Sequence, residues 1–156
     1  AQAAKAFGCE IAVCRRHPAD GQTNLTLPEL FETSDIISLH TPLNEQTLHS
    51  VNRDVLKHTA KKPILINAAR GAVVDEEAVA CAVESGLLSG FATDVYEGEP
   101  MRADSPLRRL AGRDNVLFTP HMAWGAYEAR KRLVEEVYRN IEAFLNGEAR
   151  SRVDCL

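Results

Sequence analysis

Ionisable side chains follow several apolar segments of this sequence, in a pattern that suggests acid–base chemistry. Arg70 follows the apolar run 64–66, and His121 comes shortly after the apolar run 116–118; the segment 94–99, between them, carries three acidic residues. An arginine can hold a substrate carboxylate through its fork of donors and polarise an adjacent carbonyl. A histidine can give or take a proton, and a nearby carboxylate can raise its pKa and orient its ring.

The elements that must position these side chains alternate between apolar runs and helical patterns. Expected strands lie at 9–14, 36–39, 64–66, 90–93 and 115–118, and expected helices lie at 27–34, 52–56, 75–85 and 127–145. The unbroken run 64–66 is typical of a parallel strand buried on both faces. The alternation predicts a doubly wound α/β fold with a parallel, Rossmann-like sheet. Ligands of such sheets bind outside the carboxyl ends of the strands, where we expect Arg70 to lie.

Composition limits the classes of function. The chain has 156 residues, a formal net charge of −4 and a pI near 5.7, which argues against a general nucleic-acid-binding protein. No run approaches the length of a membrane span, and residues 1–5 do not resemble a signal peptide. The four cysteines lack C-x-x-C spacing, which favours reduced thiols in a cytoplasmic protein over a disulfide or metal site. We therefore expect no metal and no nucleic-acid or membrane partner.

Four strings resemble the signatures of the D-2-hydroxyacid dehydrogenases, in that family's order and spacing. They are 39–43 (LHTPL), 65–71 (LINAARG), 94–100 (DVYEGEP) and 119–121 (TPH). The residues that follow His121 are most similar to those of glycerate dehydrogenases, also called hydroxypyruvate or glyoxylate reductases. The resemblance implies an oxidoreductase that transfers a hydride between NAD(P)H and a small 2-oxo or 2-hydroxy acid of the D-glycerate/hydroxypyruvate or glyoxylate class.

The resemblance also implies roles for individual residues. Arg70 binds the substrate carboxylate and carbonyl, His121 protonates the carbonyl oxygen during reduction, and Glu99 pairs with His121 and keeps it protonated. The alternatives are a surface arginine, a solvated loop glutamate and a capping histidine. The implied cofactor contacts are Pro42, Thr47, Ala68, Ala69, Arg70, Asp94, His121 and Trp124.

Several of these cofactor contacts have structural alternatives. Asp94 is expected beside the nicotinamide carboxamide, with a helix cap as the alternative, and Trp124 could instead pack against the sheet. Arg15 and Arg16 end the strand 9–14, where the family usually has an acidic residue that accepts hydrogen bonds from the ribose. Arginine donors suit a 2′-phosphate, so we expect NADP to be preferred over NAD. Two solvated arginines on a loop are the alternative.

The family signature is incomplete at its first element. Members of the family carry a substrate domain and a first strand with a glycine-rich turn, but no G-x-G-x-x-G string occurs in this sequence. We therefore expect an incomplete sheet in which the strands at 11–13 and 64–66 face a gap. Residues 1–150 would form a partial NAD(P)-binding domain, and 151–156 a tail that returns to a missing substrate domain. Activity and homodimer formation would belong to the full-length form.

Two alternatives of other classes stay open. One is a non-catalytic module that senses a dinucleotide and regulates a partner. The other is an inactive fragment that needs a partner chain. The presence of Arg70, Glu99 and His121 together argues against the sensing module.

Overall fold

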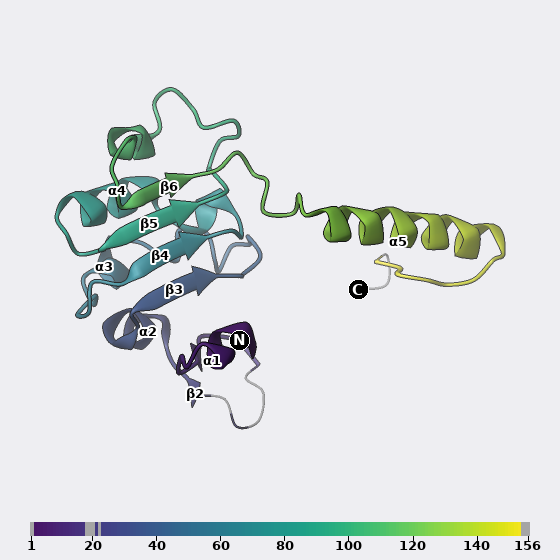
Figure 1. Ribbon diagram of the computed structural model, residues 1–156, viewed down its shortest axis with the longest axis horizontal. Coiled ribbons are helices and arrows are strands. Elements are labelled where there is room, and N and C mark those ends of the chain that lie inside the picture. Colours follow the sequence, from purple (N-terminus) through teal and green to yellow (C-terminus); the bar gives the residue numbers. More distant parts are fainter. Residues whose placement is uncertain (1, 18–20, 22, 154–156) are drawn as a thin grey trace. The chain divides into compact units, whose positions relative to one another are not determined.

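The computed structural model describes residues 2–17, 21 and 23–153, which form two compact units divided between Pro120 and His121. Each unit is described by itself. The first contains the parallel strands β3 (Ile36–Leu39), β4 (Ile64–Asn67), β5 (Gly90–Thr93) and β6 (Val116–Phe118). They form one sheet in the order β3-β4-β5-β6 (Figure 1). These four strands and the α/β class are as predicted.

A second, two-stranded sheet lies earlier in the chain. It pairs β1 (Ala12–Val13) with β2 (Thr23–Asn24) in parallel and follows the short helix α1 (Gln2–Ala6). The strand β1 lies within the strand expected at 9–14 but covers only Ala12–Val13 of it. The strand β2 is missed by the sequence pattern, because both of its residues are polar and exposed.

The prediction that the strand at 64–66 faces a gap in the sheet is wrong. Ile64 lies opposite Ile36 of β3 on one side and opposite Gly90 of β5 on the other, so β4 is paired along both edges. The strand β3, and not β4, stands at the end of the four-stranded order. The error arose because the order of elements along the chain does not reveal which strand pairs with which.

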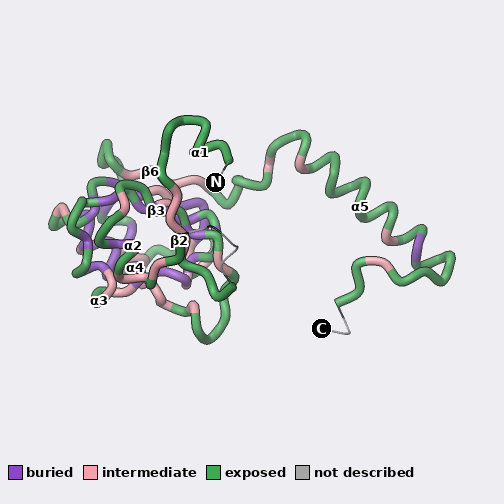
Figure 2. Tube along the Cα trace, turned by 90° about the horizontal axis from the view of Figure 1, so that it is seen from below, coloured by how far each residue is buried: buried purple, intermediate pink, exposed green. Residues whose placement is uncertain are grey.

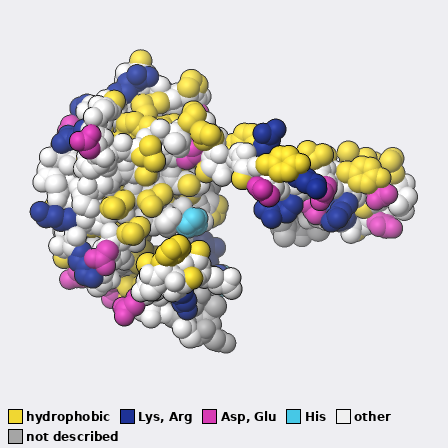
Figure 3. Space-filling model, in the orientation of Figure 1, with side chains coloured by type: hydrophobic (Ala, Val, Ile, Leu, Met, Phe, Trp, Pro, Cys, Tyr) yellow, Lys and Arg dark blue, Asp and Glu magenta, His cyan; other side chains and the backbone are white. Residues whose placement is uncertain are grey.

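The prediction that this strand is buried on both faces is also wrong. Along β4, Leu65 and Asn67 are buried whereas Ile64 is 41% exposed, because successive side chains point to opposite faces. Ile36 of β3 and Leu117 of β6, in the same sheet, are also exposed, at 60% and 61%. Figure 3 shows hydrophobic side chains gathered over the strands of this unit. Within the described residues, the core therefore lies on one side of the sheet.

Three helices and a 3-10 helix supply much of the rest of that core. They are α2 (Leu27–Thr33), α3 (Arg53–Leu56), α4 (Glu76–Glu84) and η2 (Pro106–Leu110). Phe31, Val79 and Leu110 from these elements cluster with Leu65 and Phe91 of the sheet, and buried segments appear purple in Figure 2. This packing keeps the strands in place and leaves their carboxyl ends accessible.

Capping residues begin the three helices where the sequence predicts them. At α2, Thr26 and Glu29 form a capping box, in which each side chain binds the other's backbone amide. The Asn52 side chain caps α3, and the Asp75 side chain accepts a hydrogen bond from the Ala78 amide at the start of α4.

The second unit is built on α5 (Tyr127–Leu145), which confirms the predicted helix at 127–145. Of the predicted C-terminal tail 151–156, residues 154–156 lie outside the described residues, as does Cys155. Cys9, Cys14 and Cys81 are free thiols. In the part of the chain that the structure describes, we find no helix long and apolar enough to cross a membrane.

Candidate active site

Arg70 lies in a tight turn after the carboxyl end of β4. Asn67 is fully buried; its Oδ1 accepts a hydrogen bond from the Ala69 amide at 3.1 Å, and its Nδ2 donates one to the Arg70 carbonyl at 3.0 Å. One side-chain amide therefore fixes the turn by both accepting and donating. The exposed Arg70 side chain makes one hydrogen bond within the described residues, from Nη1 to the Ala69 carbonyl at 2.7 Å. Its remaining donors are available to a substrate.

Gly71 follows Arg70, begins the 3-10 helix η1 (Gly71–Val73) and touches the loop that carries Glu99. A β-carbon added to Gly71 would lie 1.9 Å from the carbonyl carbon of Tyr96. Only glycine permits so close an approach between two backbones. The structure thus brings the Arg70 turn and the Glu99 loop together.

Glu99 lies on the exposed loop after β5, and its Oε1 accepts a hydrogen bond from the Tyr96 amide at 3.2 Å. Tyr96 ties this loop to the end of β6, because its hydroxyl donates to the Thr119 carbonyl at 2.8 Å and its ring meets Phe118 edge-on. Burial raises the pKa of Tyr96, and the charges of Asp94 and Glu99 raise it further. The neutral phenol therefore remains a hydrogen-bond donor over a wide pH range.

Asp94 is 6% exposed and follows the last residue of β5. Its Oδ1 accepts a hydrogen bond from the Thr119 hydroxyl, and its amide donates to the Asn67 carbonyl at 3.0 Å. Asp94 caps no helix among the described residues, so the helix-cap alternative does not hold. With Ala68 and Thr119 it lines a hollow of about 150 Å³ at the carboxyl ends of β4, β5 and β6.

This hollow fits part of a nicotinamide cofactor. Its volume of about 150 Å³ is below that of a pocket for a whole drug-sized ligand, which is about 300 Å³ or more, so it suits one ring. Ala68 is small and exposed, which lets a flat group approach the backbone. Asp94 offers buried carboxylate oxygens, the acceptors that a carboxamide needs.

Pro42 and Thr47 lie together in the loop after β3. Thr47 Oγ1 donates to the Pro42 carbonyl at 2.6 Å, and the Thr47 amide donates to Asn44 Oδ1 at 3.1 Å. Gln46 of the same loop accepts a hydrogen bond from the guanidinium of Arg16. This loop therefore lies beside the end of β1, where the sequence predicts the adenosine end of the cofactor.

Arg15 and Arg16 differ in how their side chains are engaged. Arg15 is exposed and donates its backbone amide to Asn24 Oδ1 at 3.1 Å. Its guanidinium makes no hydrogen bond or ion pair with another described residue, whereas that of Arg16 binds Gln46. Of the two, Arg15 is the better placed to receive an anionic group.

His121 and Trp124 belong to the second unit. The Trp124 indole Nε1 donates to the His121 carbonyl at 2.7 Å, and the indole is 59% exposed. His121 has a φ of 52°, in the left-handed region that non-glycine residues rarely adopt. The pairing of His121 with Glu99 stays a prediction.

Two residues that hold the site together are missed by sequence analysis. Tyr96 braces the Glu99 loop, and Glu76 at the start of α4 accepts hydrogen bonds from the same region. The sequence does not distinguish the buried Glu76 from the exposed Glu77, since both suit the first turn of a helix. No group of three potential metal ligands occurs in the described ranges.

A family model described as "D-isomer specific 2-hydroxyacid dehydrogenase, NAD binding domain" matches residues 1–123. The chain belongs to this family. The match confirms the resemblance carried by the four sequence strings.

Curated members of the D-2-hydroxyacid dehydrogenase family are similar to the chain over most of its length. A glyoxylate reductase of Thermofilum pendens is 44% identical over 122 residues, which is 78% of this chain and 35% of the relative. A glycerate dehydrogenase of Methylorubrum extorquens is 34% identical over 155 residues, which is 99% of this chain and 48% of the relative. The chain thus spans less than half the length of these two relatives.

Solved structures of the family share the fold. A D-lactate dehydrogenase of Aquifex aeolicus, complexed with NAD and lactic acid, has a TM-score of 0.85 and 31% identity to this chain. The match covers 94% of this chain and 49% of the dehydrogenase chain. An NADPH-dependent glyoxylate/hydroxypyruvate reductase of Sinorhizobium meliloti was solved in complex with NADP and malonate. It superimposes with a TM-score of 0.82 at 33% identity, and the match covers 92% of this chain and 45% of the reductase chain. Together with the NAD-binding-domain model, these structures support a nicotinamide dinucleotide as the cofactor class.

Proposed function

We propose that this chain is the NAD(P)-binding part of a reductase that converts a small 2-oxo acid, of the hydroxypyruvate or glyoxylate class, into its 2-hydroxy acid. The contact between the Arg70 turn and the Glu99 loop carries the proposal, because Arg70, whose donors suit a carboxylate, follows a strand end beside this acidic loop. The names of the relatives support the substrate class. The activity is proposed for the full-length form.

The members of the predicted trio have different chemical tasks. Arg70 holds the substrate carboxylate with its free donors and polarises the carbonyl. His121 donates a proton to the carbonyl oxygen, and Glu99 orients His121 and favours its protonated form. The bound nicotinamide cofactor supplies the hydride.

The proposed cofactor is NADP in preference to NAD. Arg15 supports this choice, since its guanidinium is exposed and has no partner among the described residues, and its donors match a 2′-phosphate. Pro42, Thr47, Ala68, Ala69, Asp94 and Trp124 are proposed to contact the rest of the cofactor, and Arg16 borders the same site through Gln46.

Composition and the resemblance to the family support proposals about location, partners and domain division. The free thiols and the net charge of −4 favour a cytoplasmic protein without a nucleic-acid partner. A homodimeric full-length form follows from the resemblance to the family. The proposed domain division places 1–150 in the cofactor domain and 151–156 in a tail toward a substrate domain.

Cofactor binding and turnover, measured together on the full-length protein, test the function. Quenching of protein fluorescence by NADPH together with oxidation of NADPH by hydroxypyruvate or glyoxylate would support the reductase. Quenching without turnover would favour a dinucleotide sensor, and the absence of both signals would contradict both the reductase and the sensor.

A further inference from the structure

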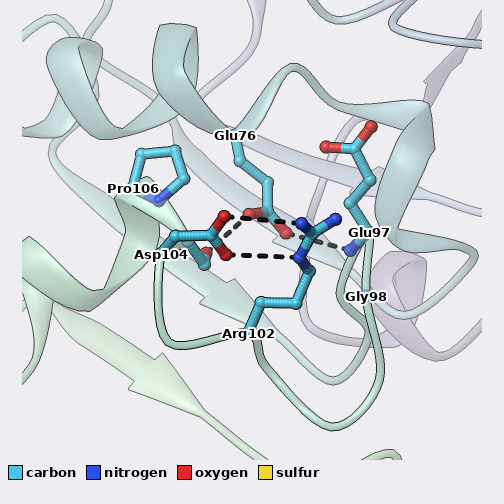
Figure 4. Close-up of a pocket in the computed structure, with 7 residues that line it drawn as sticks. Glu76, Glu97, Gly98, Arg102, Asp104 and Pro106 are labelled. Atoms are coloured by element: carbon cyan, nitrogen blue, oxygen red, sulfur yellow. Dashed lines mark hydrogen bonds and ion pairs between the residues drawn. The ribbon is translucent and has the colours of Figure 1, made fainter.

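A buried glutamate outside the predicted catalytic trio anchors the Glu99 loop. Glu76, in the first turn of α4, is 6% exposed. Its Oε1 accepts a hydrogen bond from the Glu97 amide at 2.9 Å, and its Oε2 accepts one from the Ser105 hydroxyl at 2.6 Å (Figure 4). A carboxylate taken out of water destabilises the fold unless donors reach its oxygens. Glu76 therefore favours the one loop conformation that supplies both donors.

The Glu97 amide is the neighbour of the amide that binds Glu99. The Tyr96 amide donates to Glu99 Oε1 at 3.2 Å, and one residue later the Glu97 amide donates to Glu76. Gly71 packs directly against the backbone of Tyr96 and Glu97. Together these contacts fix the direction of the amide that holds the Glu99 carboxylate.

We propose that Glu76 is a positioning residue for the reduction: it orients Glu99 through the Tyr96–Glu97 backbone. This inference rests on the proposed function and adds to it a residue that acts through Glu99 and not on the substrate. When the Glu76 side chain is shortened, the loop loses its buried anchor. Glu99 then no longer holds one position, and the protonated form of His121 is stabilised less.

Two charged pairs around this loop are exposed. His49 pairs with the Glu97 carboxylate at 3.0 Å, and Arg102 pairs with Asp104 at 3.2 Å, all with side chains at least 40% exposed. Water screens such pairs, so each contributes little to holding the loop. Asp94 adds negative charge near Tyr96. Glu76 and Asp94 are both buried, and it is Glu76 that accepts the hydrogen bond from the Glu97 amide, which is why its removal has the larger effect on this loop.

The test compares Glu76→Ala, Glu76→Gln and Glu77→Ala in the full-length enzyme. Glu77 is the next residue of α4, but it is exposed and its Oε2 binds Arg109 Nη1 at 2.8 Å. Glu77→Ala therefore removes an ion pair from the same helical turn without touching the Glu99 loop. Glu76→Gln keeps an oxygen for the Glu97 amide and gains an amide that can donate to Ser105.

The expected results separate positioning from stability. Glu76→Ala lowers kcat about tenfold, a part of the ~10²–10⁴-fold that acid–base catalysis contributes, and moves the alkaline fall of the reductive pH profile to lower pH. The Kd for NADPH stays unchanged. Glu76→Gln and Glu77→Ala both keep the pH profile of the wild type. Hydrogen exchange at the Glu97 amide becomes faster in Glu76→Ala alone.

Each contrary result has one meaning. An unmoved pH profile in Glu76→Ala, even with faster exchange at Glu97, makes Glu76 a structural anchor only and overturns the positioning role. An equal shift in Glu77→Ala overturns it as well. Both results leave the proposed function standing, because they require an active wild-type enzyme. A wild-type enzyme that reduces neither hydroxypyruvate nor glyoxylate overturns the function and the positioning role together.

Discussion

The backbones of Gly71 and Tyr96 are in direct contact, so close that a β-carbon on Gly71 would lie 1.9 Å from the Tyr96 carbonyl carbon. Gly71 follows Arg70, and the Tyr96 amide holds the Glu99 carboxylate. Two proposed catalytic residues on different strand ends are therefore linked through backbone that cannot move independently. This contact gives the site a rigidity that long exposed side chains alone would lack.

Replacing Gly71 with alanine should separate the two segments. The added β-carbon meets backbone and not a flexible side chain, so the Glu99 loop must shift. We expect a loss of about 1–3 kcal/mol in the free energy of unfolding, as for other overpacked sites, together with a large fall in kcat. Urea denaturation and steady-state kinetics measure the two effects.

Gly86→Ala is the matched control for this substitution. Gly86 has a φ of 74° and nothing within 4 Å of an added β-carbon, so alanine there strains the backbone without a clash. Gly86→Ala should lower the free energy of unfolding by about 1–2 kcal/mol and leave kcat unchanged. If Gly71→Ala retains the kcat of this control, the contact does not position the site.

Arg70→Lys tests the substrate clamp. Lysine keeps the positive charge but loses the planar fork, so one charge-assisted hydrogen bond to the substrate is lost, worth about 1.5–3 kcal/mol. The value of kcat/KM for the 2-oxo acid should fall about 10- to 100-fold, while the Kd for NADPH stays nearly unchanged. Arg113→Lys, at an exposed site before the amino end of β6 and away from the carboxyl ends of the strands, should behave as wild type. Wild-type turnover by Arg70→Lys would contradict the assignment.

Much of the fold could be predicted because local patterns carry it. The four main strands and the helix at 127–145 follow from apolar runs and helical spacing, and the caps at Asn52 and Asp75 mark helix starts. Pairing partners could not be predicted, because they depend on contacts between distant segments. The strand at 64–66 is therefore misplaced beside a gap although it pairs along both edges.

Glu99→Gln tests the proposed partner of His121. Without the carboxylate, the protonated histidine is stabilised less, so it loses its proton at lower pH. Reduction needs that proton, so its rate should fall at lower pH than in the wild type. Profiles of kcat/KM against pH for both enzymes measure the shift. Superimposable profiles would mean that another group pairs with the histidine.

Arg15→Asp tests the choice of cofactor. An aspartate repels the 2′-phosphate and can accept from the ribose, so NADPH binding should weaken by about 2–5 kcal/mol while NADH binding improves. The NADPH preference of the wild type should also weaken with added salt, because Arg15 is exposed. Arg16→Asp, whose parent side chain binds Gln46, should change the preference less. Equal catalytic efficiency with NADH and NADPH in the wild type would show that Arg15 does not read the phosphate.

The candidate site was predictable where residue type alone points to chemistry. Arg70 and Asp94 lie at strand ends, as polar residues after apolar runs suggest. The residues that hold the site in place, Glu76 and Gly71, could not be predicted in the same way. Glu76 and Glu77 are the same residue type in the same helical turn, and only the folded chain buries one and exposes the other. Likewise, nothing in the sequence indicates that the Gly71 backbone lies against that of Tyr96.

The most direct test of the account is the oxidation of NADPH by the full-length protein in the presence of hydroxypyruvate or glyoxylate, measured beside the Arg70→Lys variant. The account predicts turnover of at least one of these acids by the wild type, and a fall of about 10- to 100-fold in kcat/KM in the variant with NADPH binding retained. Binding of NADPH without turnover of either acid, or equal turnover by the two proteins, would contradict it.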